Sequence, residues 1–452
     1  VLLSSLHIHR EGRRKDDRMS TPDWLKPAMQ AIEIDDAGRA CRDIPESACR
    51  EEGNNFLRHV VSLTLSKSSD GLIDPKLVLS WLLTHLGAPA YLIGALVPVR
   101  EAGALLPQLL TAKKIRELPR RKWAWALGAL VQGLSALAIT LSALFLSGLQ
   151  AGLAIVGSLA VLAVARSVCS VSYKDVLGKT VDKSHRGTAT GLAGSLSAGA
   201  VIIFALILTF DLVERELLVL CAISLAGLFW MVAALNFTGL REEKGATEGG
   251  KNSLEAAVSN ITLLKEDRQL RLFIITRGLL TATALAPPFM ITAAGEGGTD
   301  GYGGLGFLVL ASAIASLVSS AVWGYLADRS SRKVLMFSAV AGAIALIATS
   351  VAGALDYLGV PLLLPVLLFG LMIAYQGVRL GRSTHLVDMA NEDTRAAYTA
   401  LSNTIIGVVL LAGGVFGVIA SFAGALSVLG IFALMCVGAA VMAVKLEEVQ
   451  SD

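Results

Sequence analysis

The chain has 452 residues, of which 54% are hydrophobic and 17% are charged, and its formal net charge is +3. Soluble domains carry about 25% charged residues, so this composition indicates a membrane protein rather than a soluble domain. The five cysteines and six histidines are scattered without a disulfide or metal-ligand spacing, and no metal or other cofactor is expected.

Long apolar stretches follow a polar N-terminal tail that covers residues 1–55. A helix that crosses the hydrocarbon core of a bilayer needs ~20 mostly apolar residues. By this criterion we predict about twelve membrane-spanning helices. They lie at 56–86, 88–112, 123–146, 150–173, 187–210, 216–239, 270–294, 303–327, 333–356, 360–382, 395–422 and 425–445.

Basic residues are concentrated in alternate loops between these stretches, and the intervening loops lack Lys and Arg apart from Arg215. Cytoplasmic loops of membrane proteins carry an excess of Lys and Arg. The alternation therefore predicts an even number of spans with both termini in the cytoplasm. We expect an integral protein of a bacterial inner membrane. The basic loops contain Lys113, Lys114, Arg116, Arg120, Arg121, Lys122, Lys174, Lys179, Lys183, Arg186, Arg241, Lys244, Lys251, Lys265, Arg268, Arg329, Arg332, Lys333, Arg382 and Arg395.

A polar linker at 240–269 divides the apolar chain into a six-helix bundle at 56–239 and another at 270–445, with a short C-terminus at 446–452. Segments 184–192 and 393–401 each pair an arginine with small residues that open an apolar helix. We therefore predict an all-α membrane protein of two pseudo-symmetric bundles. A site between two such repeats is a recurring plan of transporters.

Charged residues inside the predicted spans are candidate site residues, because each costs about 2.5–3.5 kcal/mol at mid-bilayer. Lys67, Asp70 and Asp74 have a spacing that places them on one face of the first span, where Pro75 is expected to kink the helix. One interpretation is a cavity-lining strip in which Asp70 takes up and releases a proton. The alternative is a structural Lys67–Asp70 ion pair.

The second span contains Arg100 and Glu101, which point ~100° apart and cannot face one partner. Glu101 is a second candidate proton carrier, although a structural salt bridge is an equal alternative. Arg277 lies in the seventh span near the position that Lys67 holds in the first. Cations from both halves suggest a site that tolerates a negatively charged substrate. Arg379 and Arg382 share a face near the end of the tenth span, where anchoring at the membrane boundary is the simpler interpretation.

A short polar motif, WGYLADRSSRK at 323–333, joins two apolar stretches. Its glycine allows two helices to approach closely, and its aspartate can interact with a helix end. The motif resembles the signature loop of the major facilitator superfamily, Gly-x-Leu-Ala-Asp-Arg-x-Gly-Arg-(Arg/Lys), with Ser331 in place of the second glycine. The resemblance implies a cytoplasmic gate in which Asp328 holds one of the alternating conformations; the alternative is topological anchoring alone. The other motif residues of this gate are Gly324, Arg329, Arg332 and Lys333.

Arg166 in the fourth span matches the arginine of the family's Arg-x-x-Gln-Gly motif, which is tied to proton coupling, but Cys169 and Ser170 replace Gln and Gly. The resemblance thus implies a secondary transporter that moves a small solute across the inner membrane by alternating access, with proton coupling through Asp70 or Glu101. Expected partners are a small-molecule substrate, protons and membrane lipid, and no nucleic acid. The alternative is a non-transporting membrane sensor that signals through its tail. An enzyme is not expected, because no nucleophile–base or metal constellation lies at a shared depth.

Overall fold

The computed structural model describes residues 51–210, 214–245, 247, 262–296, 304–390 and 392–449. The side chains of residues 109, 110, 296, 320, 321, 328, 392, 393 and 396 are outside this description. Nearly all of the predicted tail and half of the predicted linker therefore lie outside the described residues.

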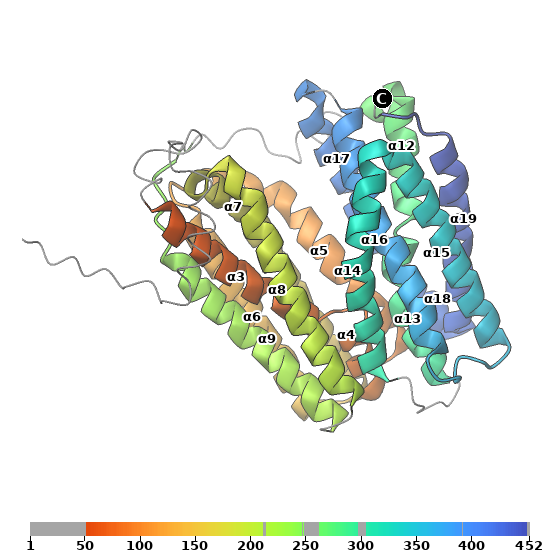
Figure 1. Cartoon of the computed structure of the whole chain (residues 1–452). Coiled ribbons are helices and arrows are strands. Elements are labelled where there is room, and N and C mark those ends of the chain that lie inside the picture. Colours follow the sequence, from red (N-terminus) through yellow and green to blue (C-terminus); the bar gives the residue numbers. More distant parts are fainter. Residues whose placement is uncertain are drawn as a thin grey trace, which may run out of the picture. The chain divides into compact units, whose positions relative to one another are not determined.

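The described chain is helical and forms two groups of helices (Figure 1). The first group comprises α3 (Glu52–Leu72), α4 (Val78–His85), α5 (Ala90–Arg116), α6 (Lys122–Phe145), α7 (Gly148–Thr180), α8 (Lys183–Thr209) and α9 (Arg215–Thr238). After the short α11 (Leu263–Glu266), the second group comprises α12 (Arg268–Leu279), α13 (Ala282–Glu296), α14 (Leu305–Arg329), α15 (Ser331–Ala354), α16 (Leu363–Met389), α17 (Glu392–Ala412), α18 (Val415–Ala423) and α19 (Ala425–Val444).

Ten helical stretches of the described chain are long and apolar enough to cross a membrane, and Leu305–Ser319 is a shorter apolar helix within the predicted eighth span. This pattern confirms the predicted all-α membrane fold. The remaining predicted span, the first, is divided between α3 and α4. Many large apolar side chains on the outer faces are exposed, among them Leu134 and Phe422, as expected for helices that face lipid.

The break in the first span has a local cause. Pro75 has no backbone N–H and cannot continue α3, while the Asp74 carboxylate accepts a hydrogen bond from the backbone N–H of Lys76 at 2.7 Å. Ser80 Oγ donates to the carbonyl of Pro75 at 2.8 Å. The predicted strip of Lys67, Asp70 and Asp74 on one continuous helix is therefore wrong, because Asp74 lies in the break.

The seventh span is also broken, between α12 and α13. Leu280 and Thr281 separate the two helices, and Thr281 Oγ1 donates to the carbonyl of Gly278 at 2.6 Å. Farther along, Pro287 and Pro288 lack the N–H groups that would otherwise bond to the carbonyls four residues earlier. Corresponding spans of the two groups are thus both interrupted.

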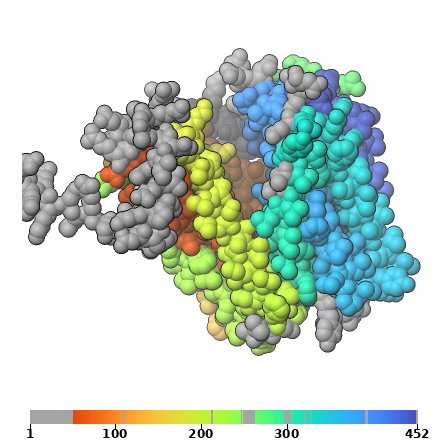
Figure 2. Space-filling view, in the orientation of Figure 1, coloured from red at the N-terminus to blue at the C-terminus, as the bar shows by residue number. Residues whose placement is uncertain are grey.

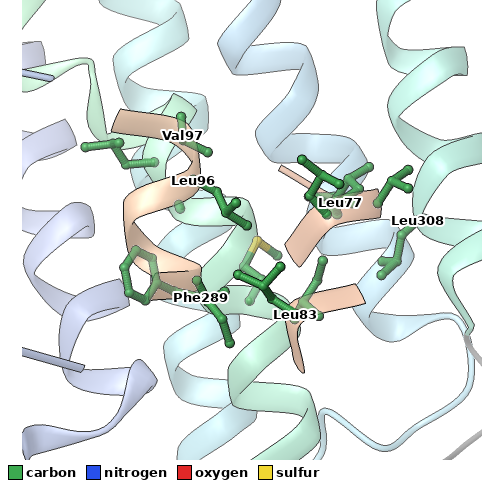
Figure 3. Packing of buried hydrophobic residues seen from close by; sticks show 14 of the residues in the cluster. Leu77, Leu83, Leu96, Val97, Phe289 and Leu308 are labelled. Carbon is green, nitrogen blue, oxygen red and sulfur yellow. The ribbon is translucent and has the colours of Figure 1, made fainter. Parts of the chain in front are cut away.

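Contacts between the two groups are extensive at the membrane face opposite the Lys- and Arg-rich loops, which we call the basic face. At this opposite face, α4 packs on α13 and α5 packs on α18. Buried apolar side chains from both groups gather there (Figure 3); the labelled residues are Leu77, Leu83, Leu96, Val97, Phe289 and Leu308. We call these six residues the apolar seal.

The approach of α5 and α18 depends on two glycines. A Cβ atom added to Gly94 would lie 2.5 Å from the Cα atom of Gly417, closer than real side chains allow. Glycine at both positions therefore permits backbone contact beside the apolar seal.

Toward the basic face the helices of the two groups diverge (Figure 1). α8 packs along α14 and α5 along α17, but α7 and α16 form no comparable contact within the described residues. Figure 2 shows the yellow-green atoms of α8 lying against the teal atoms of α14. The described chain is therefore closed at the opposite face and more open at the basic face.

Candidate functional site

Asp70 lies at the centre of an ion cluster formed by three helices of the first group. One carboxylate oxygen of Asp70, on α3, contacts Arg100 Nη2 of α5 at 2.7 Å, and the other contacts Arg166 Nη2 of α7 at 2.6 Å. Two guanidinium groups thus share one carboxylate. The structure brings together three of the residues predicted from the sequence.

The environment of this cluster excludes the predicted Lys67–Asp70 pair. Lys67 Nζ donates to the carbonyl of Thr190 on α8 at 3.0 Å and is not within salt-bridge distance of Asp70. Arg166 Nη1 also donates to Ser66 Oγ at 3.0 Å, and the same oxygen accepts from the indole N–H of Trp230 at 3.2 Å. Arg166 is therefore held by two side chains of α3.

The break in the first span contributes a cation that reaches the second group. Lys76 is buried, and its Nζ lies 3.7 Å from the centre of the Tyr375 ring on α16. A desolvated ammonium over an aromatic face is attracted by the ring quadrupole. Lys76 and Tyr375 thus connect the two groups beside Asp74.

Glu101 points away from the Asp70 cluster, as its ~100° separation from Arg100 requires. It lines a cavity of about 30 Å³ together with residues of α12, α13, α16 and α17. The charges of Lys76, Arg100, Arg382 and Arg379 act on its carboxylate. The cavity lining also includes Arg277, Leu280, Thr281, Thr283, Ala284, Tyr375, Val378 and Leu410.

The three arginines of this cavity come from the second group. Arg277 of α12 is 6% exposed and donates to Ser402 Oγ at 2.7 Å and to Asn403 Oδ1 at 2.9 Å, both on α17. Arg379 and Arg382 line the same cavity from α16. They were expected to anchor the membrane boundary, whereas the structure places both on the lining of this cavity, where Arg379 is exposed.

The signature-like loop forms the junction between α14 and α15 at the basic face. Ser330 caps α15 by accepting from the backbone N–H of Lys333 at 3.1 Å, and its hydroxyl donates to Glu448 at 2.5 Å. Arg332 Nε lies 3.5 Å from the same carboxylate. Arg329 is exposed and lies over the ring of Tyr325 at 4.2 Å. The chain after α19 is thereby tied to this loop.

Two features of the loop differ from the prediction. A Cβ atom on Gly324 would meet no atom within 4 Å, so the expected close helix approach at this glycine is not seen; Gly377 of α16 makes such an approach, to Trp323 and Ser338. Ser331, which replaces the family's glycine, is fully buried and lies 2.9 Å from His385 Nδ1. The Asp328 side chain lies outside the described residues, so its gate role stays a prediction.

The first group has a different polar network at the basic face. Glu242, whose side chain has no exposed surface, accepts from the backbone N–H groups of Arg121 at 2.9 Å and Lys122 at 2.8 Å. Asp175 of α7 pairs with Arg121 and with Lys179, the latter at 2.7 Å. Asp175 and Glu242 thus hold the start of α6.

Several of these contacts were not predicted from the sequence. Lys76, Ser402 and Asn403 were not among the predicted site residues. The sequence signal that could have identified them is a polar residue inside an apolar span, because such a residue needs a polar partner when it is buried. Among the described residues, no group of three His, Cys, Asp or Glu could hold a metal ion.

Comparison with known proteins gives a likeness in structure alone. The sequence matches no protein-family model and no curated protein. The structure is similar to a point mutant of the nucleoside transporter NupG, with a TM-score of 0.67 and 14% sequence identity over 87% of this chain and 100% of that one.

Two further solved structures have the same architecture. A D-xylose-proton symporter gives a TM-score of 0.63 at 12% identity, covering 87% of this chain and 97% of the symporter. A POT family transporter in complex with a thioalcohol-conjugated peptide gives 0.61 at 11% identity, covering 87% and 95%. The chain has the fold of major facilitator superfamily transporters, as the signature-like loop suggested.

Proposed function

We propose that this protein is a secondary transporter that moves a small solute across the membrane by alternating access, driven by protons. The interruption of corresponding spans, at 73–77 and 280–281, is the observation that carries the proposal. Interrupted spans at matching positions of two repeats mark the binding site in many transporters. Here they place Lys76 beside Tyr375 and Thr281 on the cavity with Arg277.

The two helical groups, at 56–239 and 270–445, would act as the moving halves. The apolar seal and the Gly94–Gly417 contact keep the opposite face closed, and the divergence of the two groups toward the basic face would leave the site accessible from there. By the positive-inside rule the basic face is cytoplasmic, with both termini on that side. The described conformation then corresponds to the inward-facing state.

Proton coupling would act through Asp70. Its carboxylate neutralises Arg100 of α5 and Arg166 of α7, while Lys67 on its own helix adds a third nearby cation. A proton on Asp70 removes the negative charge that Arg100 and Arg166 share and frees both to reorient. Because these three residues join α3, α5 and α7, protonation would alter how those helices pack.

The test is proton movement in vesicles that contain the purified protein, followed with an internal pH dye while small solutes are added. The wild-type protein is expected to give a solute-dependent signal. Asp70→Asn should abolish it, and Asp356→Asn should retain it, because Asp356 is an exposed residue far along the chain from the cluster. The Glu101→Gln variant tests whether the Glu101 carboxylate is also required for the proton signal.

Each other result has a definite meaning. Solute flux without proton movement would contradict the proton coupling, but the transport function itself would stand. An Asp70→Asn variant that still moves protons would contradict the role of Asp70. A protein that moves no solute, but whose N-terminal tail captures a partner protein, would favour the membrane sensor. The similar solved structures are transporters rather than enzymes, which is compatible with a non-enzymatic role.

A further inference from the structure

The cavity between α5 and the second group is deficient in negative charge. Arg277, Arg379 and Arg382 line it, whereas Glu101 is its one carboxylate lining residue. The formal charges of these four side chains sum to +2. In the described part of the chain, no carboxylate oxygen lies within salt-bridge distance of any of the three arginines, so the excess charge is not compensated by an ion pair.

Arg277 has an unused donor. Its two terminal nitrogens bond to neutral groups, Ser402 Oγ and Asn403 Oδ1, while its Nε is buried and has no hydrogen-bond partner. The charge of Arg382 acts on Arg277 from α16 and repels it. A buried guanidinium with a free N–H and like charge nearby is costly unless an anion joins it.

The size and lining of the cavity indicate what kind of anion would fit. Its 30 Å³ corresponds to about two water molecules at 10–15 Å³ each, which is room for an acidic group rather than for a whole sugar or nucleoside. Guanidinium groups match the geometry of carboxylate and phosphate oxygens. Leu280, Val378 and Leu410 provide apolar lining beside the arginines.

We propose that this cavity binds the acidic group of a small organic anion, a carboxylate or a phosphate-type group, with Arg277, Arg379 and Arg382 as its cationic partners. Leu280, Val378 and Leu410 flank the acidic group, and the rest of the molecule would extend out of the cavity. This inference rests on the proposed transport function and names its substrate class. Glu101 opposes the anion, so a proton on Glu101 would favour binding.

Equilibrium binding to the purified full-length protein in detergent tests this site without requiring transport. The probes are butanoate, propylphosphonate and the neutral butanamide, and the readout is the concentration dependence of the melting temperature, which rises when a ligand binds the native state. At least one of the two anions should raise the melting temperature, and butanamide should not.

Arginine variants then locate the site. Arg277→Gln and Arg382→Gln should each weaken binding of the anion about 10- to 100-fold, the effect of losing one charge-assisted contact. Arg268→Gln is the matched control, because Arg268 is exposed at the start of the same helix α12. Glu101→Gln should tighten binding about threefold or more, which a variant that merely unfolds cannot do.

Outcomes for the site and for transport are separable. Equal stabilisation by butanamide, no stabilisation by either anion, or unchanged affinity in Arg277→Gln would overturn the anion site. A protein that fails these tests yet moves a neutral or cationic solute in vesicles remains a transporter with another substrate class. A protein that passes them but catalyses no flux keeps the anion site and loses the transport function.

Discussion

Cationic side chains outnumber carboxylates around the membrane-embedded centre, and their placement differs between the two groups. In the first group, Asp70 compensates Arg100 and Arg166 directly. In the second, Arg277 is held only by the neutral Ser402 and Asn403. The first arrangement is a closed ion cluster and suits a proton switch, whereas the second leaves charge available for a ligand.

Asp267 provides a pH-dependent contact at the basic face, outside the membrane-spanning segments. It caps α12 by accepting from the backbone N–H groups of Gln269 at 2.7 Å and Leu270 at 3.0 Å, and it accepts the hydroxyl of Tyr398 at 2.5 Å. Partial burial raises the pKa of Asp267. The three hydrogen bonds together lower it by more, so its pKa lies below the usual value.

Replacing Asp267 should therefore destabilise the protein in a pH-dependent way. A carboxylate with a depressed pKa stabilises the native state above its unfolded pKa of about 3.9, and this contribution disappears as the pH falls through the lower native pKa. Asp267→Ala should cost about 1 kcal/mol of unfolding free energy near pH 7, the usual cost of losing an N-cap.

Asp267→Asn keeps a capping oxygen and removes the charge, so it separates the two effects. Thermal unfolding of both variants and of the wild-type protein would be compared from pH 7 to pH 3. The difference between wild type and Asp267→Asn should shrink as the pH falls below about 4. A difference that stays constant with pH would show that the Asp267 charge does not contribute.

At the level of whole helices, interrupted spans and a glycine contact form the closure of the opposite face. The first, seventh and eleventh spans are each divided, and the interruptions separate the halves that form the opposite-face closure (α4, α13 and α18) from the halves toward the basic face. Such a division lets the closure move without bending a continuous helix. The Gly94–Gly417 contact is the tightest point at which this closure can be tested.

Gly94→Ala should open the opposite face. Its new Cβ would lie 2.5 Å from the Gly417 backbone, and overpacking of this kind costs about 1–3 kcal/mol in the closed conformation. Alkylation of Leu83→Cys, in a chain without the native cysteines, reports the opening because Leu83 is fully buried in the apolar seal. The labelling rate should rise roughly 5- to 100-fold over the same chain with Gly94.

Gly430→Ala is the matched control for this experiment. A Cβ atom on Gly430, in α19, would meet nothing within 4 Å, so this variant has the same gain in helix propensity without the clash. Its labelling rate should equal that of the parent. If Gly94→Ala also labels at the parental rate while melting normally, the glycine contact does not control the opposite face.

At the scale of the molecule, the fold was predictable because hydrophobic length and loop charge are local signals in the sequence. The all-α fold and the membrane class follow from them and are confirmed, while the break in the first span follows from Pro75. Partners across helices were not predictable. Asp70 pairs with residues 30 and 96 positions away, and Arg277 with residues more than 120 positions away, so the packing of the groups decides them.

The orientation of neighbouring side chains shows the same limit. A helical spacing established that Arg100 and Glu101 diverge, but only the structure shows that Arg100 faces Asp70 and Glu101 faces the arginine-lined cavity. Arg379 and Arg382 were misplaced for the same reason, since distance from the end of a span does not reveal which neighbour a side chain faces. The Asp328 gate and the exact domain boundaries stay predictions.

The most direct test of a proton-driven carrier compares two transport modes in Asp70→Asn. Vesicles containing this variant would be assayed for exchange of labelled propylphosphonate, which stays anionic and does not cross the bilayer unaided, between equal internal and external pools. They would also be assayed for its accumulation under an imposed proton gradient. Wild-type protein should do both. Asp70→Asn should retain exchange and lose accumulation, because alternation continues while the proton switch is absent. Accumulation by Asp70→Asn at the wild-type rate would contradict the account.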